Sequence, residues 1–265
     1  MSNYTAEIEE ILGFVERKEE MVAMIAPSFL VDFSYPEFVG MLRRLGFGHV
    51  VEVGVGAVET NRQLLDLLKL SPGQRYITAP CPTIVRLVKN KYPDLVPFLA
   101  LVDSPMIATA KIVAEKYPNH RKVYIGPCVA KKLEAKEDHA ELEIVVLTYQ
   151  EIAEIFRIKN IFPQKSDQDY SFDLAASHTR LYPISGGLAQ SSGLTKTLTD
   201  SEYSVISGPE LVEKTLQEFS SQPEIKLLDI LYCEGGCISG AGIINQESLD
   251  SRREKIITFW HNEQK

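Results

Sequence analysis

Three short β-rich runs in this chain of 265 residues end directly in a cysteine. The runs are "YITAPC", "VYIGPC" and "LDILYC", and they end at Cys81, Cys128 and Cys233. Because binding sites in open α/β sheets gather at the carboxyl ends of strands, we expect these thiols to meet at one edge of the fold. The fourth cysteine, Cys237, follows Cys233 after one short glycine-containing loop. The sequence therefore predicts a four-cysteine site assembled from distant segments.

Helix-like and strand-like segments alternate along the chain, which indicates an α/β fold of packed layers. Strand patterns cover residues 21–27, 49–56, 74–80, 122–127 and 225–233, and a strand followed by a helix covers 142–156. Helix patterns cover residues 5–21, 36–46, 58–70, 82–92, 104–117, 209–221 and 251–260. Residues 160–207 are polar and rich in glycine, and they give no clear pattern. We expect a single domain over residues 1–265.

The composition excludes several classes of function. With 45% hydrophobic residues the chain can bury a core. A formal net charge of -8 and no long Lys/Arg run disfavour a nucleic-acid partner. The N-terminus is acidic and amphipathic rather than a signal peptide, and the most apolar stretch is too short to span a bilayer. We therefore expect a cytoplasmic protein without membrane insertion.

Four thiolates suit either zinc or an iron–sulfur cluster, and a disulfide framework is not expected in a cytoplasmic chain of this size. Structural zinc usually takes its ligands in closely spaced pairs, and only Cys233 and Cys237 form such a pair here. A cubane needs backbone N–H donors and room for the main chain to approach it, which glycine provides. Glycines flank these cysteines at positions 126, 235, 236, 240 and 242. An iron–sulfur site is favoured, with zinc as the alternative.

Three ordered motifs resemble those of the catalytic domain of iron-only ([FeFe]) hydrogenases. The family motif T-S-C-C-P corresponds to "TAPCP" (78–82), and M-P-C-x-x-K-x-x-E corresponds to "GPCVAKKLE" (126–134). The third, E-x-M-A-C-x-G-G-C-x-x-G-G-G, corresponds to "DILYCEGGCISGAG" (229–242). Shorter matches are "IAPSF" (25–29), "DSPM" (103–106) and "ISGGL" (184–188). The resemblance covers essentially the whole chain.

The resemblance implies a fold of two lobes, each a small sheet flanked by helices, with a metal cluster in the cleft between them. It implies a [4Fe-4S] cubane bound by Cys81, Cys128, Cys233 and Cys237, with Cys237 bridging to a diiron subcluster that bears CO and CN ligands. Lys131 matches the lysine that hydrogen-bonds a cyanide, and Glu134 matches the acid of the second motif. The remaining matched positions of the diiron pocket are Ala26, Pro27, Ser28, Pro80, Ser104, Pro105, Gly126 and Leu231.

The sequence departs from the family pattern at the positions that the family uses to move protons and to surround the diiron site. Pro80 stands where the family has its proton-relay cysteine, and Ala100 stands where it has a relay serine. The acidic pair of the relay helix aligns near Gln63 and Leu64, and the two methionines beside the diiron site become Gly126 and Leu231. This pattern resembles the branch of the family that has a proposed sensory role. It predicts slow turnover, because loss of a positioned proton donor costs a factor of about 10²–10⁴ in rate.

The function expected from the resemblance is slow, reversible H₂ oxidation and proton reduction, with a role in sensing H₂ or redox state. The implied partners are an external electron donor or acceptor protein, a signalling partner and the maturation proteins that supply the diiron unit. No ferredoxin-like C-x-x-C-x-x-C run occurs in the chain. The alternative is a non-catalytic [4Fe-4S] protein, either a redox sensor or a scaffold in cluster assembly. The run "VVEVGVGA" (50–57) also resembles a nucleotide or S-adenosylmethionine loop, but the next strand ends without the acid that such sites need.

Overall fold

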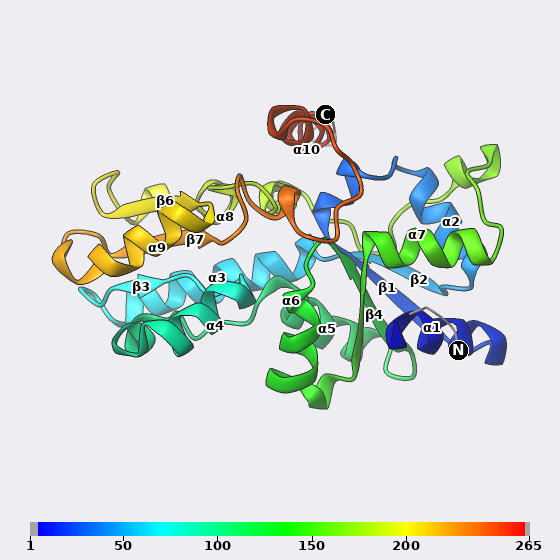
Figure 1. Ribbon diagram of the computed structural model, residues 1–265, viewed down its shortest axis with the longest axis horizontal. Helices are drawn as coiled ribbons and strands as arrows, with labels where there is room; N and C mark the ends of the chain where they lie inside the picture. Colours follow the sequence, from blue (N-terminus) through cyan, green and yellow to red (C-terminus); the bar gives the residue numbers. More distant parts are fainter. Residues whose placement is uncertain (1–4, 263–265) are drawn as a thin grey trace.

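The computed structural model describes residues 5–262 and contains two separate parallel β-sheets with helices against both faces of each (Figure 1). The strands are β1 (Met21–Ile25), β2 (His49–Glu52), β3 (Tyr76–Ile77), β4 (Arg121–Gly126), β5 (Ile144–Thr148), β6 (Tyr203–Ser207) and β7 (Leu227–Leu231). The helices are α1 (Ala6–Arg17), α2 (Glu37–Leu45), α3 (Gly54–Leu70), α4 (Pro82–Lys91), α5 (Pro105–Lys116), α6 (Ala130–Leu133), α7 (Tyr149–Ile158), α8 (Gly187–Ser192), α9 (Pro209–Glu218) and α10 (Leu249–Asn262). The α/β expectation is confirmed.

The first sheet has the strand order β2-β1-β4-β5, and every neighbouring pair is parallel. Strand β1 is buried along its whole length, because helices cover both faces of the sheet. One face packs against α1, α2 and α7 through residues such as Ile11, Leu42 and Ile152. The other face packs against α5 through Ile107 and Val113. This sheet occupies the right-hand half of Figure 1.

The second sheet has the order β3-β7-β6, again with parallel neighbours, and lies in the left-hand half of Figure 1. Helices α4 and α9 cover one face, where Ile84 and Val212 pack against Leu228 and Ile230. Helices α3 and α8 contribute Leu64 and Leu188 to the cluster on the other face. Each sheet therefore has its own core, and α3 extends from the second sheet toward the first (Figure 1).

The sequence predicts most elements, but three differ. The predicted strand over residues 49–56 ends at Glu52, and the two glycines that follow, Gly54 and Gly56, begin α3 rather than a loop. A Cβ on Gly56 would meet the backbone N of Thr109 at 2.5 Å, so this glycine allows α3 to pack closely against α5. The predicted strand over 74–80 is only Tyr76–Ile77. Strand β6 and helix α8 lie within residues 160–207, where no pattern is clear.

No helix within residues 5–262 is both long enough and apolar enough to cross a bilayer.

Candidate metal centre

A cleft between the two sheets collects the carboxyl ends of strands from both. Its walls come from the segments after β1, β3, β4 and β7 together with the start of α5. The empty space amounts to about 700 Å³, including the part that opens to solvent. The lining residues are Ala26, Pro27, Ser28, Val53, Pro80, Cys81, Pro82, Pro105, Met106, Tyr124, Pro127, Cys128, Lys131, Tyr182, Pro183, Leu188, Asp229, Leu231 and Cys237. The strand ends therefore meet as the sequence predicts.

The four cysteines lie near enough to one another to interact electrostatically. None forms a disulfide, and all four are partly buried. Burial, together with the nearby Cys81 and Cys128 thiolates, raises the pKa of the Cys233 thiol to about 12. Burial and the other three cysteines also raise the pKa of Cys237. Four thiolates gathered in this way repel one another, so their ionised form needs a positively charged group among them.

The donor set of this site is four cysteine thiols. Among residues 5–262, no three or more His, Cys, Asp or Glu side chains are arranged to hold one metal ion. Tetrahedral zinc needs sulfur atoms about 2.3 Å from one centre. A cubane presents four different iron atoms, so its ligand sulfurs stand farther apart. The chemistry of the donor set, four thiols drawn from three strand ends, fits an iron–sulfur cubane.

Backbone groups around the cysteines provide the environment that a cluster needs. The backbone N–H groups of Ala130 and Lys131 lower the pKa of the Cys128 thiol, against a larger increase from burial and Cys81. In the "CEGGC" loop, Gly235 and Gly236 have φ angles of 69° and 106°, which glycine adopts without strain. A Cβ on Gly236 would meet the backbone N of Ser185 at 2.9 Å. These glycines allow the loop to turn tightly beside the "ISGGL" segment.

Lys131 places a buried ammonium group at the wall of the cleft. Its side chain is 9% exposed, and its Nζ donates hydrogen bonds to the carbonyl oxygen of Pro80 (3.1 Å) and to Ser104 Oγ (3.0 Å). Nζ also lies 2.6 Å from Glu134 Oε2, at an angle that makes the contact an ion pair without a regular hydrogen bond. Glu134 is itself buried, so it is not the surface glutamate that its charged neighbours in the sequence suggest.

Replacement of Lys131 by methionine is expected to lower the free energy of unfolding by about 3 kcal/mol, because it leaves the Glu134 carboxylate buried without its partner. The double variant Lys131→Met/Glu134→Leu should recover most of this loss. Lys136→Met is the control, because its ion pair with Glu7 is exposed and is worth less than about 1 kcal/mol. Urea unfolding of the metal-free protein measures all three, and equal losses in the single and double variants would contradict the buried ion pair.

Asp229, on β7, is a second buried charge in the cleft. Burial raises its pKa to about 6, against a smaller opposing effect from the N–H of Ala189, which donates to Oδ2 at 3.2 Å. The unfolded chain loses this proton near pH 4 and the folded chain near pH 6. Between these values the folded state binds more protons, so stability falls as the pH rises through this window and then levels off.

We expect Asp229→Asn to abolish this pH-dependent loss, which amounts to about 3 kcal/mol in the wild type. The amide oxygen can still accept the N–H of Ala189. The measurement is urea unfolding of the metal-free wild type and variant at several values between pH 4 and pH 7. Parallel stability curves for the two proteins would show that Asp229 is not the group that titrates.

Most residues predicted for the site line the cleft, and three do not. Cys233 is coupled electrostatically to Cys81 and Cys128 but is not among the lining residues. Ser104 reaches the site through its hydrogen bond with Lys131. Gly126 lies behind the ring of Tyr124. The other predicted residues of the set, which are Ala26, Pro27, Ser28, Pro80, Cys81, Pro105, Cys128, Lys131, Leu231 and Cys237, all contact the cleft.

Sequence reasoning missed several residues of the cleft wall. Tyr182 and Pro183 come from the segment 160–207, where no pattern was clear, whereas Leu188 belongs to the matched "ISGGL" run. Tyr124 stands two residues before Gly126 on the same strand, so the alternation of side chains along β4 could have placed it on the same face.

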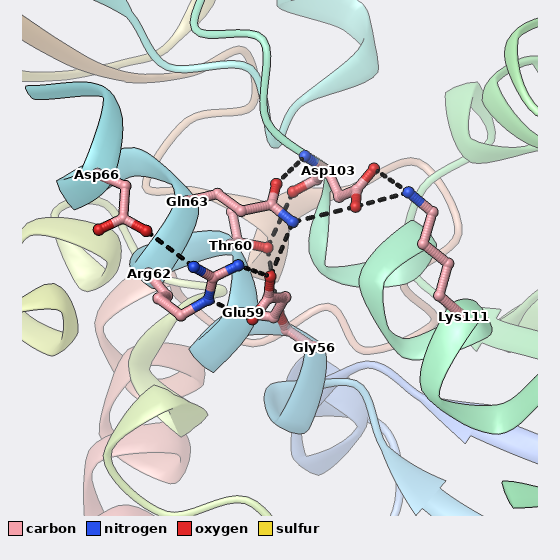
Figure 2. Close-up of polar contacts among 8 residues, drawn as sticks. All are labelled: Gly56, Glu59, Thr60, Arg62, Gln63, Asp66, Asp103 and Lys111. Carbon is pink, nitrogen blue, oxygen red and sulfur yellow. Dashed lines mark hydrogen bonds and ion pairs between the residues drawn. The ribbon is translucent and has the colours of Figure 1, made fainter. Parts of the chain in front are cut away.

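Two positions that the motif resemblance assigns to a proton relay are an amide, Gln63, and an apolar side chain, Ala100. Gln63 and Ala100 line an outer cavity with Glu134. Figure 2 shows the Gln63 amide bound to Asp103, with Nε2 donating to Oδ2 (3.1 Å) and the Asp103 N–H donating to Oε1 (2.8 Å). Gln63 Nε2 also donates to Glu59 Oε1 at 3.0 Å. The guanidinium of Arg62 lowers the pKa of Glu59 to about 2, so this carboxylate holds no proton at neutral pH.

Residues 19–241 match the sequence model of a family described as "Iron only hydrogenase large subunit, C-terminal domain". One curated relative is the NADP-reducing hydrogenase subunit HndD of Solidesulfovibrio fructosivorans, which is 24% identical over 257 residues, 76% of this chain and 44% of the relative. Another is the cytosolic Fe-S cluster assembly factor NAR1 of Kluyveromyces lactis, which is 23% identical over 250 residues, 66% of this chain and 53% of the relative. The chain thus spans about half the length of these curated relatives.

Among solved structures, a variant of the [FeFe]-hydrogenase HydA1 from Chlamydomonas reinhardtii superposes with a TM-score of 0.73. The alignment covers 96% of this chain and 88% of that one, at 17% sequence identity. At this level of identity the similarity establishes the shared fold and nothing finer.

Proposed function

Because this chain belongs to the family of the iron-only hydrogenase large subunit, C-terminal domain, we propose that it holds a [4Fe-4S] cubane with a diiron subcluster beside it. The cubane ligands are Cys81, Cys128, Cys233 and Cys237, and Cys237 also bridges to the diiron unit. When bound, the diiron unit with its carbonyl and cyanide ligands supplies the centre at which H₂ is split or formed. The proposed activity is slow, reversible H₂ oxidation and proton reduction in a sensory role.

The observation that carries this proposal is the buried ammonium of Lys131 at the wall of the cysteine cleft. A cubane alone needs no cation at that position, whereas a cyanide ligand carries negative charge and needs a donor when it is buried. Two N–H donors of Lys131 are used by Pro80 and Ser104, and the contact with Glu134 lacks hydrogen-bond geometry. Lys131 also belongs to the lining of the cleft, so its ammonium lies close to any anionic ligand held there.

The rest of the cleft supplies room and excludes water. Ala26, Pro27, Pro105 and Leu231 present apolar surface to the space beside the cysteines. Such walls lower the local dielectric constant and strengthen the interaction between Lys131 and a bound anion. Ser28 has its hydroxyl 2.8 Å from that of Tyr149, which fixes its orientation at the edge of the cleft.

Turnover is slow in this proposal because the residues at the proton-relay positions cannot donate or accept a proton. Pro80 has neither a titratable side chain nor an N–H, Ala100 is apolar, and Gln63 is an amide held by Asp103. The loss of one positioned proton donor costs a factor of about 10²–10⁴. Losses within one relay chain do not multiply, because its members act together. A binding site with little turnover is suited to reporting H₂ or redox state.

We propose that electrons reach the cubane from outside residues 1–265, which hold only the four cysteines assigned to this site. We therefore include an external electron donor or acceptor, or a signalling protein, among the partners. Dedicated maturation proteins would deliver the diiron unit. The word "cytosolic" in the name of the relative NAR1 supports a cytoplasmic location.

The second candidate is a non-catalytic [4Fe-4S] protein that acts as a redox sensor or as a scaffold in cluster assembly. Its support is the similarity to Fe-S cluster assembly factors from Kluyveromyces lactis and Caenorhabditis elegans, the latter 22% identical over 81% of this chain. The missing proton relay is compatible with this function as well.

Iron counting under anaerobic conditions separates the two candidates. Reconstitution with iron and sulfide should give about four iron atoms per chain. Incubation with a synthetic diiron cofactor should raise the count to about six, and reduced methyl viologen should then drive slow H₂ evolution. An iron count that stays near four after this incubation would favour the non-catalytic candidate.

A further inference from the structure

Tyr124 points from β4 toward the cysteine cleft. It pairs with Met24 and Val146 of the neighbouring strands, is 4% exposed, and belongs to the lining of the cleft. Side chains two residues apart on a strand share a face and lean along it, so the tyrosine ring lies over Gly126. Cys128 stands two residues beyond the end of the strand and also lines the cleft. The Tyr124 side chain therefore reaches the cysteine cleft from strand β4.

The Tyr124 hydroxyl has no hydrogen-bond partner among residues 5–262. Buried tyrosine hydroxyls usually find one. Tyr149, the other fully buried tyrosine beside the cleft, donates to the Ala26 carbonyl oxygen at 3.0 Å and lies 2.8 Å from Ser28 Oγ. The free donor of Tyr124 is therefore directed toward something that the protein alone does not provide.

Gly126 makes this placement of the ring possible. A Cβ on Gly126 would lie 2.6 Å from Cε1 and Cζ of Tyr124 and would also overlap the hydroxyl oxygen. A methionine at position 126, as in the family motif, is therefore incompatible with the ring in this position. The two residues are therefore linked: because Gly126 has no side chain, the Tyr124 ring and hydroxyl can occupy the space beside it.

Tyr124 shares the lining of the cleft with Cys128 and Cys237, and after Tyr149 these thiolates have the largest electrostatic effect on its hydroxyl. We infer that Tyr124 donates a hydrogen bond to a cluster-bound thiolate of this pair and thereby raises the reduction potential of the cubane. This inference rests on the proposed function, because it requires the cubane to be present. Burial raises the pKa of Tyr124 well above its usual value, so the hydroxyl keeps the proton that it donates.

The direction of the effect follows from charge. Reduction adds an electron to the cluster, and the more negative thiolates accept hydrogen bonds more strongly. Hydrogen bonds to cluster sulfurs are one of the factors that set the potential of such clusters. A donor that stabilises the reduced state more than the oxidised state therefore raises the midpoint potential.

The test is an EPR-monitored redox titration of the protein that carries only the reconstituted cubane, so that no hydrogenase activity enters the readout. Tyr124→Phe removes the hydroxyl without breaking any protein hydrogen bond. We expect its equilibrium constant for reduction to fall about tenfold, which is about 59 mV for a one-electron couple. Tyr76→Phe is the control, because this tyrosine is buried in the core of the second sheet, outside the cleft, and the potential should not move.

Gly126→Ala provides a second, independent variant. Its Cβ must displace the tyrosine ring, so the potential should fall in the same direction as in Tyr124→Phe. In the double variant Gly126→Ala/Tyr124→Phe the alanine should add no further shift. A Tyr124→Phe protein with a full cubane and an unchanged potential would overturn this inference while leaving the proposed function intact. A wild-type protein that takes up no cubane would overturn both.

Discussion

Replacement of Cys128 by serine is expected to reduce the iron bound after anaerobic reconstitution from about four atoms per chain to less than about one. Cys128 stands two residues after the end of β4, and the backbone N–H groups of Ala130 and Lys131 lower the pKa of its thiol. A serine hydroxyl is a much poorer ligand for iron than a thiolate, so a cubane with three sulfur ligands should be lost. Iron and acid-labile sulfide assays measure the effect.

The matched control is Val129→Ser, which introduces the same side chain one residue later. Val129 is 52% exposed and outside the cleft lining, so its iron content should remain at the wild-type value. The same loss is expected for Cys81, Cys233 and Cys237. Full iron content in the Cys128→Ser protein would contradict the four-cysteine assignment.

Replacement of Pro80 by cysteine is expected to increase the rate of H₂ evolution by about a hundredfold in protein loaded with the diiron cofactor. Pro80 is buried, lines the cleft, and is adjacent to Cys81, so a thiol at this position would face the same space. The contact with Lys131 involves the backbone carbonyl of residue 80, and any residue there retains it. The variant therefore adds a proton donor and leaves the ammonium in place.

Pro80→Ser separates the effect of the thiol from the effect of removing the proline ring. The serine variant regains the same backbone N–H but carries a hydroxyl whose proton is far less acidic. Only the cysteine variant should gain activity, measured with reduced methyl viologen as electron donor. Equal rates in both variants and the wild type would place the block farther out, at Ala100 or at the Gln63 amide that Asp103 holds (Figure 2).

The sequence predicts the cysteines of the site better than the other residues that line the cleft. Cysteines after β3 and β7 lie at one edge of the second sheet, because parallel strands end on the same side. That Cys128, after β4 of the first sheet, joins them depends on how the two sheets pack, which strand direction alone does not determine. The cleft indeed includes Cys81, Cys128 and Cys237. Tyr182 and Pro183 were missed because they come from a turn in a segment without periodicity.

Local composition was also misleading where tertiary packing decides the outcome. Gly54 and Gly56 suggest a turn, yet they lie in the first turn of α3. Residue 56 is glycine because the close approach of α5 leaves no room for a side chain there. Glu134 lies in a run of charged residues and is nonetheless buried against Lys131. Neither result could be predicted without knowing which distant segment lies opposite.

The central claim is that the cleft holds a diiron subcluster beside the cubane. Infrared spectroscopy tests it most directly, on anaerobic protein first reconstituted with iron and sulfide and then given a synthetic diiron cofactor. We expect protein-bound carbonyl and cyanide bands that shift under H₂, and we expect the cyanide bands to be altered in the Lys131→Met variant. An intact cubane without any such bands would contradict it and leave the non-catalytic iron–sulfur function as the better description.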